Sequence, residues 1–295
     1  MTSLSGKVVL ITGGARGVGA EVARRVHRRG ARLVLVDLDA APLEAMAAEL
    51  GPDALPVVAD VRDLPAMESA VAQGIERFGG IDIVMANAGI ASYGSVLAVD
   101  PAAFRRLIDV NVVGVFHTVR AALPSIVERR GYVLIVSSAA AYAAAPGLAP
   151  YCASKAGVEH FANSLRLEVA HLGVDVGSAH MSWIDTPMVQ DAKADLPAFR
   201  KMLAALPGPL GKTTSVEVCG RGFERGIERR AKRINVPGWV GVARWLKPLM
   251  QTTLAERDIR NNAGTLLPEM DAEVAGLGRS VSARMQALDE ADPKR

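Results

Sequence analysis

The chain has 295 residues, half of them hydrophobic and 22% charged, a composition that can fill a sizeable core and excludes global disorder. Its net charge is +3 with a pI near 9.0, and the densest basic clusters, RRVHRR and ERRAKR, contain no aromatic residues, which argues against nucleic-acid binding. The two cysteines, Cys152 and Cys219, match no metal-binding spacing, so we expect no metal site and a reducing, cytoplasmic location.

Short apolar runs alternate with amphipathic stretches along most of the chain. The runs rich in valine, leucine and isoleucine predict strands buried on both faces, at residues 7–12, 32–38, 55–61, 81–89, 132–138, 174–181 and 233–237. Apolar spacing and capping residues predict helices at residues 19–30, 39–51, 63–79, about 100–128, 151–173 and 215–230. Because strands and helices alternate, right-handed crossovers give an α/β fold, a Rossmann-type, doubly wound parallel sheet.

A glycine-rich turn, TGGARGVG, joins the first predicted strand to the first predicted helix. Gly13, Gly17 and Gly19 allow a tight turn and let the backbone approach a pyrophosphate closely. The helix that follows offers unpaired N–H groups and the positive end of its dipole to that anion. Since the turn lies between a buried strand and a helix, it predicts a dinucleotide site that also includes Arg16 and Val18.

The second predicted strand ends at Asp37, 18 residues after Gly19. A carboxylate there can accept hydrogen bonds from the ribose hydroxyls and repels a 2′-phosphate, which favours NAD over NADP. Arg16 argues the other way, because a guanidinium in the turn can hold a phosphate. We give Asp37 more weight, since a carboxylate desolvated against a phosphate is costly. We expect Asp39, rather than Asp37, to cap the next helix.

Tyr151 and Lys155 lie four residues apart at the beginning of a predicted helix, so they share one helix face. A neighbouring ammonium and the positive nicotinamide of an oxidised cofactor lower the pKa of a phenol, which can then act as acid and base. Ser138 and Asn87 end two predicted strands at the sheet edge where ligands bind. Asn111 lies among valines in a long helix, where it either makes a core hydrogen bond or helps to orient a water.

In order and spacing, several motifs resemble the short-chain dehydrogenase/reductase family over about residues 5–190: TGGARGVG, Asp60-Val61, the NAG run at 87–89, Asn111, Ser138 and YCASK. The resemblance implies that Tyr151 is the acid/base, and that Lys155 binds the nicotinamide ribose and lowers the pKa of the tyrosine. It implies that Ser138 orients the substrate oxygen and that Asn111 holds a water in a proton relay. It also implies a set of further cofactor contacts, namely Asp60, Val61, Asn87, Ala88, Gly89, Ile184 and Thr186.

The chain departs from the family pattern after its sixth predicted strand. The family has Pro-Gly where this chain has Met181 and Ser182. We expect the turn to be altered and Trp183 to sit differently near the pocket, with hydride transfer preserved. We expect Cys152, next to Tyr151, to be a buried small residue that faces away from the site.

The resemblance indicates a dinucleotide-binding catalytic domain, residues 1–237, and a C-terminal helical extension, residues 238–295. Residues 188–212 fall where the family carries a mobile substrate lid, and their apolar spacing fits a bulky apolar substrate or simple coverage of the core equally well. Trp239 and Trp245 in the extension can pack over the pocket, form a subunit interface or rest on a membrane. We expect packing rather than membrane association. Family members usually pair through their long helices, so we expect a homodimer or homotetramer.

The sequence therefore predicts an NAD(H)-dependent enzyme that interconverts a secondary alcohol and a ketone. A nucleotide-sugar epimerase or dehydratase is one alternative, because such enzymes share the tyrosine–lysine pair. The Gly-x-x-x-Gly-x-Gly spacing and the expected lack of a large substrate domain after residue 190 argue against it. A non-catalytic NAD sensor is a second alternative, but a sensor has no need of Tyr151, Lys155 and Ser138 together.

Overall fold

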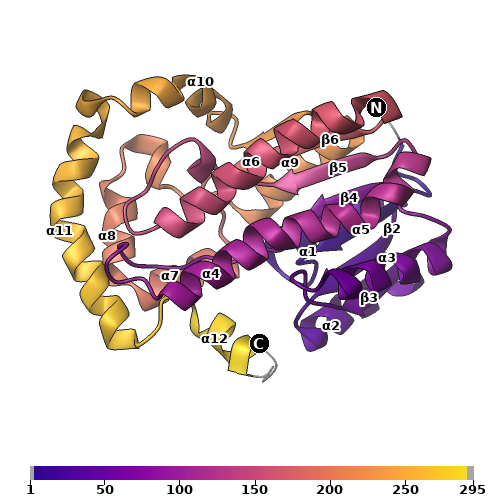
Figure 1. Cartoon of the computed structure of the whole chain (residues 1–295), viewed down its shortest axis with the longest axis horizontal. Coiled ribbons are helices and arrows are strands. Elements are labelled where there is room, and N and C mark those ends of the chain that lie inside the picture. Colours follow the sequence, from indigo (N-terminus) through magenta and orange to yellow (C-terminus); the bar gives the residue numbers. More distant parts are fainter. Residues whose placement is uncertain (1–2, 291–295) are drawn as a thin grey trace.

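One parallel sheet organises the computed structural model, which describes residues 3–290 (Figure 1). The strands are β1 (Val8–Thr12), β2 (Arg32–Asp37), β3 (Ala54–Val58), β4 (Ile83–Ala86), β5 (Tyr132–Val136), β6 (Asp175–Met181) and β7 (Arg233–Val236). Their order across the sheet is β3-β2-β1-β4-β5-β6-β7, and every pair of neighbours is parallel. The order reverses between β1 and β4, so the carboxyl ends of these strands border the crevice where such folds bind ligands.

Helices cover both faces of the sheet, each over its own apolar core. One face carries α1 (Gly17–Arg28), α2 (Ala40–Leu50) and α9 (Val216–Glu228). The other carries α3 (Leu64–Phe78), α4 (Pro101–Ile108), α5 (Gly114–Glu128) and α6 (Ala149–Val169). In β1, Val8 and Leu10 join the second core, whereas Val9 and Ile11 join the first. Burial on both faces is the reason that the strand sequences are apolar throughout.

The long helix predicted at residues 100–128 is continuous but not regular. A π-helical turn, Asp109–Val113, separates α4 from α5 and contains Asn111. By length and composition, Pro101–Glu128 is the one described helix that could cross a membrane. It packs against α3 and α6 over the sheet, as a core helix of a globular protein does.

The lid segment and the C-terminal extension lie together at one end of the molecule (Figure 1). The lid contains α7 (Pro187–Asp195), α8 (Pro197–Ala205) and a short 3₁₀ turn (Gly208–Gly211). The extension contains α10 (Val240–Met250), α11 (Thr253–Leu277) and α12 (Ala283–Glu290). α11 runs beside α8, and its Met270 and Val274 join lid residues such as Phe199 in a third apolar cluster.

Polar contacts fasten the lid to the extension. The Arg279 guanidinium donates two hydrogen bonds to the Asp195 carboxylate, at 2.9 and 3.0 Å. The Glu273 carboxylate accepts from the backbone N–H of Ala198 at 3.0 Å, at the beginning of α8. The junction between the two lid helices is therefore held by residues that lie about eighty positions later in the chain.

Candidate active site

The glycine-rich turn after β1 is tightly packed against the end of β4. Gly13 and Gly17 have φ of +66° and +55°, the left-handed region that favours glycine. A Cβ on Gly19 would lie 2.0 Å from the carbonyl oxygen of Gly13. The Asn87 amide donates to the carbonyl oxygens of Thr12 and Gly13 at 2.9 and 3.1 Å. Asn87 thus holds the turn against the end of β4. The glycines leave the backbone of the turn without side chains, as close contact with a pyrophosphate requires.

Asp37 ends β2 beside this turn. Its carboxylate accepts from the backbone N–H groups of Ala15 and Asp39, at 3.1 and 3.2 Å. Arg16 is paired with the Asp39 carboxylate at 2.7 Å. Asp39 does occupy the N-cap position of α2, but its side chain makes no capping hydrogen bond there. The ion pair with Arg16 takes the carboxylate away from the helix end.

A single cavity of about 1400 Å³ runs from the glycine turn along the carboxyl edge of the sheet to the lid and the extension. It brings together these predicted site residues: Gly13, Arg16, Gly17, Val18, Asp37, Asp60, Val61, Asn87, Ala88, Gly89, Ser138, Tyr151, Lys155, Ile184 and Thr186. Two predicted residues do not line it, Gly19 and Asn111. Gly19 instead allows the helix to pack closely against the Gly13 carbonyl. Asn111 is fully buried.

The nucleotide end of the cavity contains Asp60 and Val61. The Asp60 carboxylate accepts from the backbone N–H of Arg62 at 2.9 Å and pairs with its guanidinium at 2.8 Å. This pairing orders the segment after β3 beside Asp37. Arg62 also lines the cavity, although its sequence context gave no signal for it.

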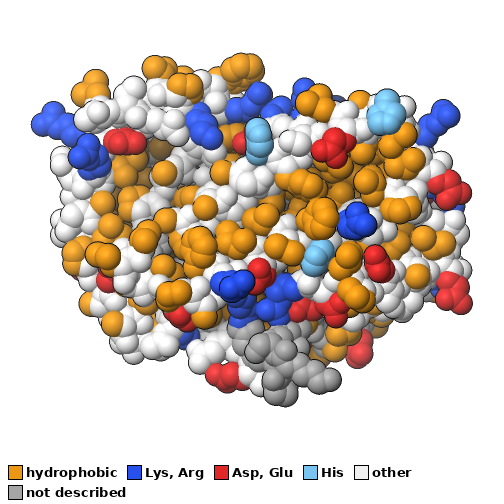
Figure 2. Space-filling model, in the orientation of Figure 1, with side chains coloured by type: hydrophobic (Ala, Val, Ile, Leu, Met, Phe, Trp, Pro, Cys, Tyr) orange, Lys and Arg blue, Asp and Glu red, His pale blue; other side chains and the backbone are white. Residues whose placement is uncertain are grey.

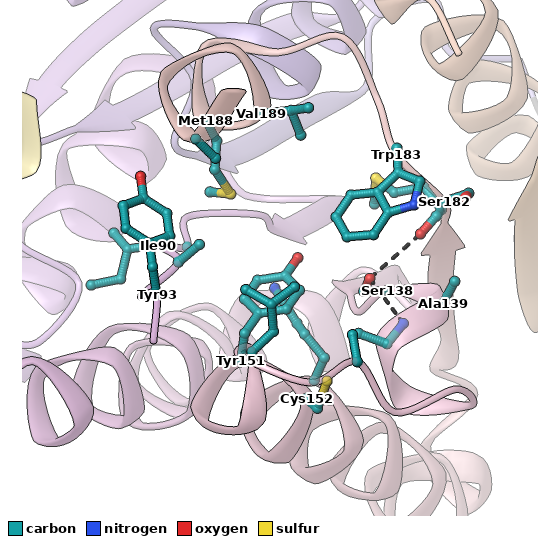
Figure 3. A pocket seen from close by; sticks show the side chains of 18 of the residues that line it. Ile90, Tyr93, Ser138, Ala139, Tyr151, Cys152, Ser182, Trp183, Met188 and Val189 are labelled. Carbon is teal, nitrogen blue, oxygen red and sulfur yellow. Dashed lines mark hydrogen bonds between the residues drawn. The ribbon is translucent and has the colours of Figure 1, made fainter. Parts of the chain in front are cut away.

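Ser138 and Tyr151 point into the same part of the cavity, from the end of β5 and the beginning of α6 (Figure 3). The Ser138 hydroxyl donates to the carbonyl oxygen of Met181 at 3.4 Å and accepts from the N–H of Ala140 at 3.1 Å. The Lys155 ammonium lies 5.6 Å from the centre of the Tyr151 ring and donates to the carbonyl oxygen of Val136 at 3.0 Å. A hydroxyl, a phenol and an ammonium therefore converge where a substrate oxygen would sit.

The protein groups alone shift the pKa of Tyr151 upward, opposite to the direction expected for the cofactor complex. Burial raises the pKa of Tyr151 to about 12, and the hydrogen bond with Ser138 acts in the other direction. Burial also lowers the pKa of Lys155 to about 8. Desolvation is the largest cause of both pKa shifts. An oxidised nicotinamide bound beside the phenol would add a positive charge that lowers the pKa of Tyr151.

The Asn111 side chain is fully engaged with the protein. Its amide oxygen accepts from the N–H of Ile90 at 2.8 Å, and its amide nitrogen donates to the Ile90 carbonyl at 2.9 Å and the Ser154 hydroxyl at 3.1 Å. These contacts are the core hydrogen bonds that were one of the two expectations for Asn111. The residue lies in a π-helical turn, and its part in a water relay stays a prediction.

A buried histidine that the sequence did not single out lies behind Ser138. His180, in β6, faces the Ser138 carbonyl oxygen with Nδ1 at 3.3 Å and the Ser178 hydroxyl with Nε2 at 2.9 Å. Its ring stacks on Tyr142, with centroids 4.6 Å apart. The carbonyl partner requires a proton on Nδ1, so Nε2 accepts from Ser178. His180 thus fixes the backbone that carries Ser138.

We expect this histidine to make stability depend on pH. Burial lowers the pKa of His180 to about 4, whereas a histidine in the unfolded chain titrates near 6.5. As pH falls from about 6.5 towards 4, the unfolded chain takes up the proton first, so the free energy of unfolding falls. The contribution between pH 7 and pH 5 is about 2 kcal/mol. Urea unfolding of the wild type and of His180→Asn at both pH values measures it. Equal pH slopes for the two proteins would contradict the assignment.

Met181 and Ser182 shape the wall beyond β6. Met181 still pairs with Val236 of β7, and the Ser182 N–H donates to the Val236 carbonyl at 2.9 Å. Trp183 then turns towards the lid, where its ring meets Phe199 edge-on at 5.4 Å. The replacement of Pro-Gly thus leaves an extended strand end and an indole in the pocket wall (Figure 3).

Cys152 does not face away from the site as the sequence suggested. It is partly buried, lines the cavity and packs with the lid cluster. Burial raises the pKa of its thiol, so it acts as an apolar side chain rather than a nucleophile. Two successive residues in the first turn of α6, Tyr151 and Cys152, thus line the cavity.

The extension contributes residues to the cavity that the sequence analysis did not assign. Ile259, Ala263, Leu266 and Met270 recur at helical spacing along α11, and all four line the cavity. This apolar stripe was present in the sequence as a helical pattern. The packing of α11 beside α8 decides that this stripe faces the cavity.

The comparisons with known proteins agree with this geometry. A family model described as short chain dehydrogenase matches residues 7–197. The chain therefore belongs to the short-chain dehydrogenase/reductase family, and it has that family's Rossmann fold. It is an oxidoreductase of this family, and several relatives are named as NAD-dependent oxidoreductases.

Two curated relatives are oxidoreductases by name. A (−)-trans-carveol dehydrogenase of Rhodococcus erythropolis is 37% identical over 209 residues, which cover 65% of this chain and 76% of that protein. An uncharacterised NAD-dependent oxidoreductase of Mycobacterium tuberculosis is 34% identical over 207 residues, which cover 64% and 75%.

Solved structures show the same fold at similar identity. A 3-ketoacyl-(acyl-carrier-protein) reductase from Brucella melitensis in complex with NADH has a TM-score of 0.72 at 30% identity, covering 79% of this chain and 98% of its own. Levodione reductase has a TM-score of 0.74 at 28% identity, covering 81% and 99%. These neighbours are matched almost completely, so about a fifth of this chain has no counterpart in either of them.

Proposed function

We propose that the protein interconverts a secondary alcohol and a ketone with NAD(H), on a bulky apolar substrate. The observation that carries this proposal is the convergence of Tyr151, Ser138 and Lys155 on the cavity that also contains the glycine turn and Asp37. A nucleotide-binding protein without catalysis has no need of this convergence.

Ser138, Tyr151 and Lys155 each have a separate role in the proposed reaction. Bound NAD⁺ supplies the acceptor for a hydride, and NADH supplies the donor in the reverse direction. The Ser138 hydroxyl holds the substrate oxygen in line with the Tyr151 phenol. Tyr151 takes the alcohol proton during oxidation and returns one during reduction, while the Lys155 ammonium stabilises the phenolate. The enclosed wall of Trp183 and the lid keeps bulk water from the reacting atoms.

The arrangement of charges around the adenosine site supports NAD over NADP. Asp37 lines the cavity at the end of β2, where a ribose 2′-phosphate would meet its negative charge. Arg16, the cation that could neutralise such a phosphate, is already paired with Asp39.

Replacing Asp37 with alanine should reduce the preference for NAD over NADP by about 10- to 100-fold, the effect of losing hydrogen bonds to a charged acceptor. The ratio of kcat/KM for the two cofactors measures the change. Asp63→Ala is the matched control, because it removes a carboxylate that caps α3 and does not line the cavity. A wild type that already uses NADPH better than NADH would contradict the cofactor assignment.

The shape and lining of the substrate end support an apolar alcohol. Its walls include Leu148, Trp183, Phe199, Met202 and Met270. A nucleotide sugar, with its diphosphate and hydroxyls, would leave many polar groups unpaired against such walls. The similarity to a protein named as a carveol dehydrogenase agrees with this proposal, because carveol is an alcohol.

A panel of secondary alcohols with NAD⁺, followed by NADH absorbance, tests the function. We expect turnover of cyclic and long-chain apolar alcohols, with KM falling as apolar size increases. Turnover of small polar alcohols alone, or of a nucleotide sugar, would contradict the proposal.

We also propose a cytoplasmic homodimer or homotetramer. Phe104, Phe116 and Leu167 are exposed on α4, α5 and α6, the helices through which family members pair. Contacts between copies would bury them. Both cysteines are unpaired, as in a reducing compartment. Light scattering gives the oligomeric state directly.

A further inference from the structure

The helix α10 presents its apolar side to solvent. Val242, Trp245, Leu246 and Leu249 follow one another on one face at helical spacing, and all four are exposed. Trp245 is 75% exposed and Leu249 63%. An ordinary surface helix would have turned this face inward.

The opposite face of α10 is the packed one, although it is less apolar. Val240 is fully buried against Ala141 and Tyr142. The Lys247 ammonium also points to the protein, where it donates to the Ala141 carbonyl oxygen at 3.0 Å. The orientation of the helix is therefore fixed from its inner side, and its apolar face is left without a partner among the described residues.

The apolar face continues past the end of α10. Leu254, in the first turn of α11, is 81% exposed. We call Val242, Trp245, Leu246, Leu249 and Leu254 the apolar ridge. α10 and the beginning of α11 form the outer edge of the molecule (Figure 1), and hydrophobic side chains stand out along that edge with basic ones beside them (Figure 2). Contiguous exposed apolar groups of this kind mark an interaction surface.

The charges around the ridge are mainly positive. Among the charged side chains of Val240–Asn262, Lys247 faces the protein, and Glu256, Asp258 and Arg260 line the cavity. Arg244 and Arg257 are the two that do neither. The Arg244 guanidinium lies 4.7 Å from the centre of the Trp245 ring. A tryptophan with an adjacent cation is suited to the headgroup level of a bilayer, where the indole is half buried and the cation meets anionic lipid.

The ridge borders the substrate cavity without forming part of it. Met250, Gln251, Ala255 and Ile259 line the cavity, and they lie between or beside the ridge residues in sequence. None of the five ridge residues lines it. The same two helices thus present one side to the exterior and the other to the chamber that reaches Tyr151.

We propose that the apolar ridge docks on an anionic lipid surface, so that an apolar alcohol or ketone passes from the bilayer into the chamber. The proposal deepens the proposed function and rests on it for the substrate. It replaces the expectation that the whole extension packs against protein. A second copy of the chain is the less favoured occupant, because it would not account for the cation beside Trp245.

Co-sedimentation of the full chain with vesicles tests the docking. We expect the wild type to sediment with vesicles that contain phosphatidylglycerol, and less with phosphatidylcholine alone or at high salt. Trp245→Ser/Leu249→Ser should weaken sedimentation at least about tenfold. The matched control is Val96→Ser/Leu97→Ser, which removes two side chains that are 76% and 99% exposed in a loop away from the ridge.

Two outcomes overturn the docking. One is a wild type that does not sediment with anionic vesicles, or that sediments equally with and without the ridge substitutions. The other is a ridge variant that loses an oligomer in light scattering while vesicle binding is absent, which assigns the ridge to a second copy.

Turnover of a water-soluble secondary alcohol without vesicles separates docking from catalysis. The ridge variant should match the wild type in that assay, whereas its apparent KM for an apolar alcohol dissolved in vesicles should rise about tenfold. An inactive wild type in the soluble assay would count against the proposed function and leave the sedimentation result intact.

Discussion

Tyr151→Phe should lower kcat by about 10³-fold while leaving the affinity for NADH within about threefold of wild type. A positioned acid/base contributes about 10²- to 10⁴-fold to rate, and the substitution removes only the phenol oxygen. The ring stays, so its packing against the core beneath α4, α5 and α6 and against the lid cluster should be kept. Steady-state kinetics with the best alcohol of the panel and fluorescence titration with NADH measure the two quantities.

The same cavity offers a matched control. Tyr93 is a second buried phenol that lines it, and burial raises the pKa of Tyr93 as well (Figure 3). Tyr93→Phe removes an oxygen of the same kind, whose hydrogen-bond partner is Ser282 rather than Ser138. It should retain most of the turnover. A Tyr151→Phe enzyme that remains as active as Tyr93→Phe would rule out the acid/base role.

Truncation after Pro237 should raise KM for the apolar substrate at least about 100-fold with NADH affinity little changed. The loss removes α11, and with it the wall that Met270 and its neighbours contribute to the chamber. It also removes the partners of Phe199 and of the Asp195 carboxylate in the lid. Loss of such buried apolar contacts costs about 2–5 kcal/mol per large side chain, so the lid should no longer hold its position.

A full-length variant separates the wall from the fastening. Arg279→Gln breaks the ion pair with Asp195 and leaves α11 in place. Its KM should rise by less than that of the truncated chain, because the apolar wall that α11 contributes to the chamber remains. Circular dichroism checks that both proteins keep the sheet. A truncated chain with unchanged KM would show that the extension takes no part in substrate binding.

Local patterns in the sequence were enough to predict the sheet and the glycine turn. A strand buried on both faces must be apolar throughout, and Val8–Thr12 and Tyr132–Val136 are. The glycines of the turn are required by backbone geometry, which does not depend on distant residues. The position of Tyr151 relative to Lys155 follows from helical spacing alone.

Features that depend on distant residues were not predictable in the same way. The sequence could place Asp39 at a helix start, but not show that Arg16 would claim its carboxylate. It could not decide whether Asn111 faced Ile90 or a water, since the partners are 21 residues apart in sequence. The pKa of Tyr151 depends on how completely the lid and extension exclude water, a property of the folded whole.

The direction of the two extension helices shows the limit most clearly. Helical periodicity shows that α10 and α11 each have an apolar face, but not which way that face turns. The inner side of α11 is fixed by Phe199 and Leu203 in the lid, and that of α10 by Ala141. Only tertiary contacts reveal that one apolar stripe lines a chamber and the other meets the exterior.

The distance in sequence between the lid and the helix that fastens it sets an order of events during synthesis. Every part of the nucleotide groove lies before Pro187, so it can assemble while the ribosome is still translating the rest. The chamber for the second reactant lacks one wall until α11 emerges, which begins more than sixty residues later. A nascent chain should therefore bind dinucleotide before it can select an alcohol.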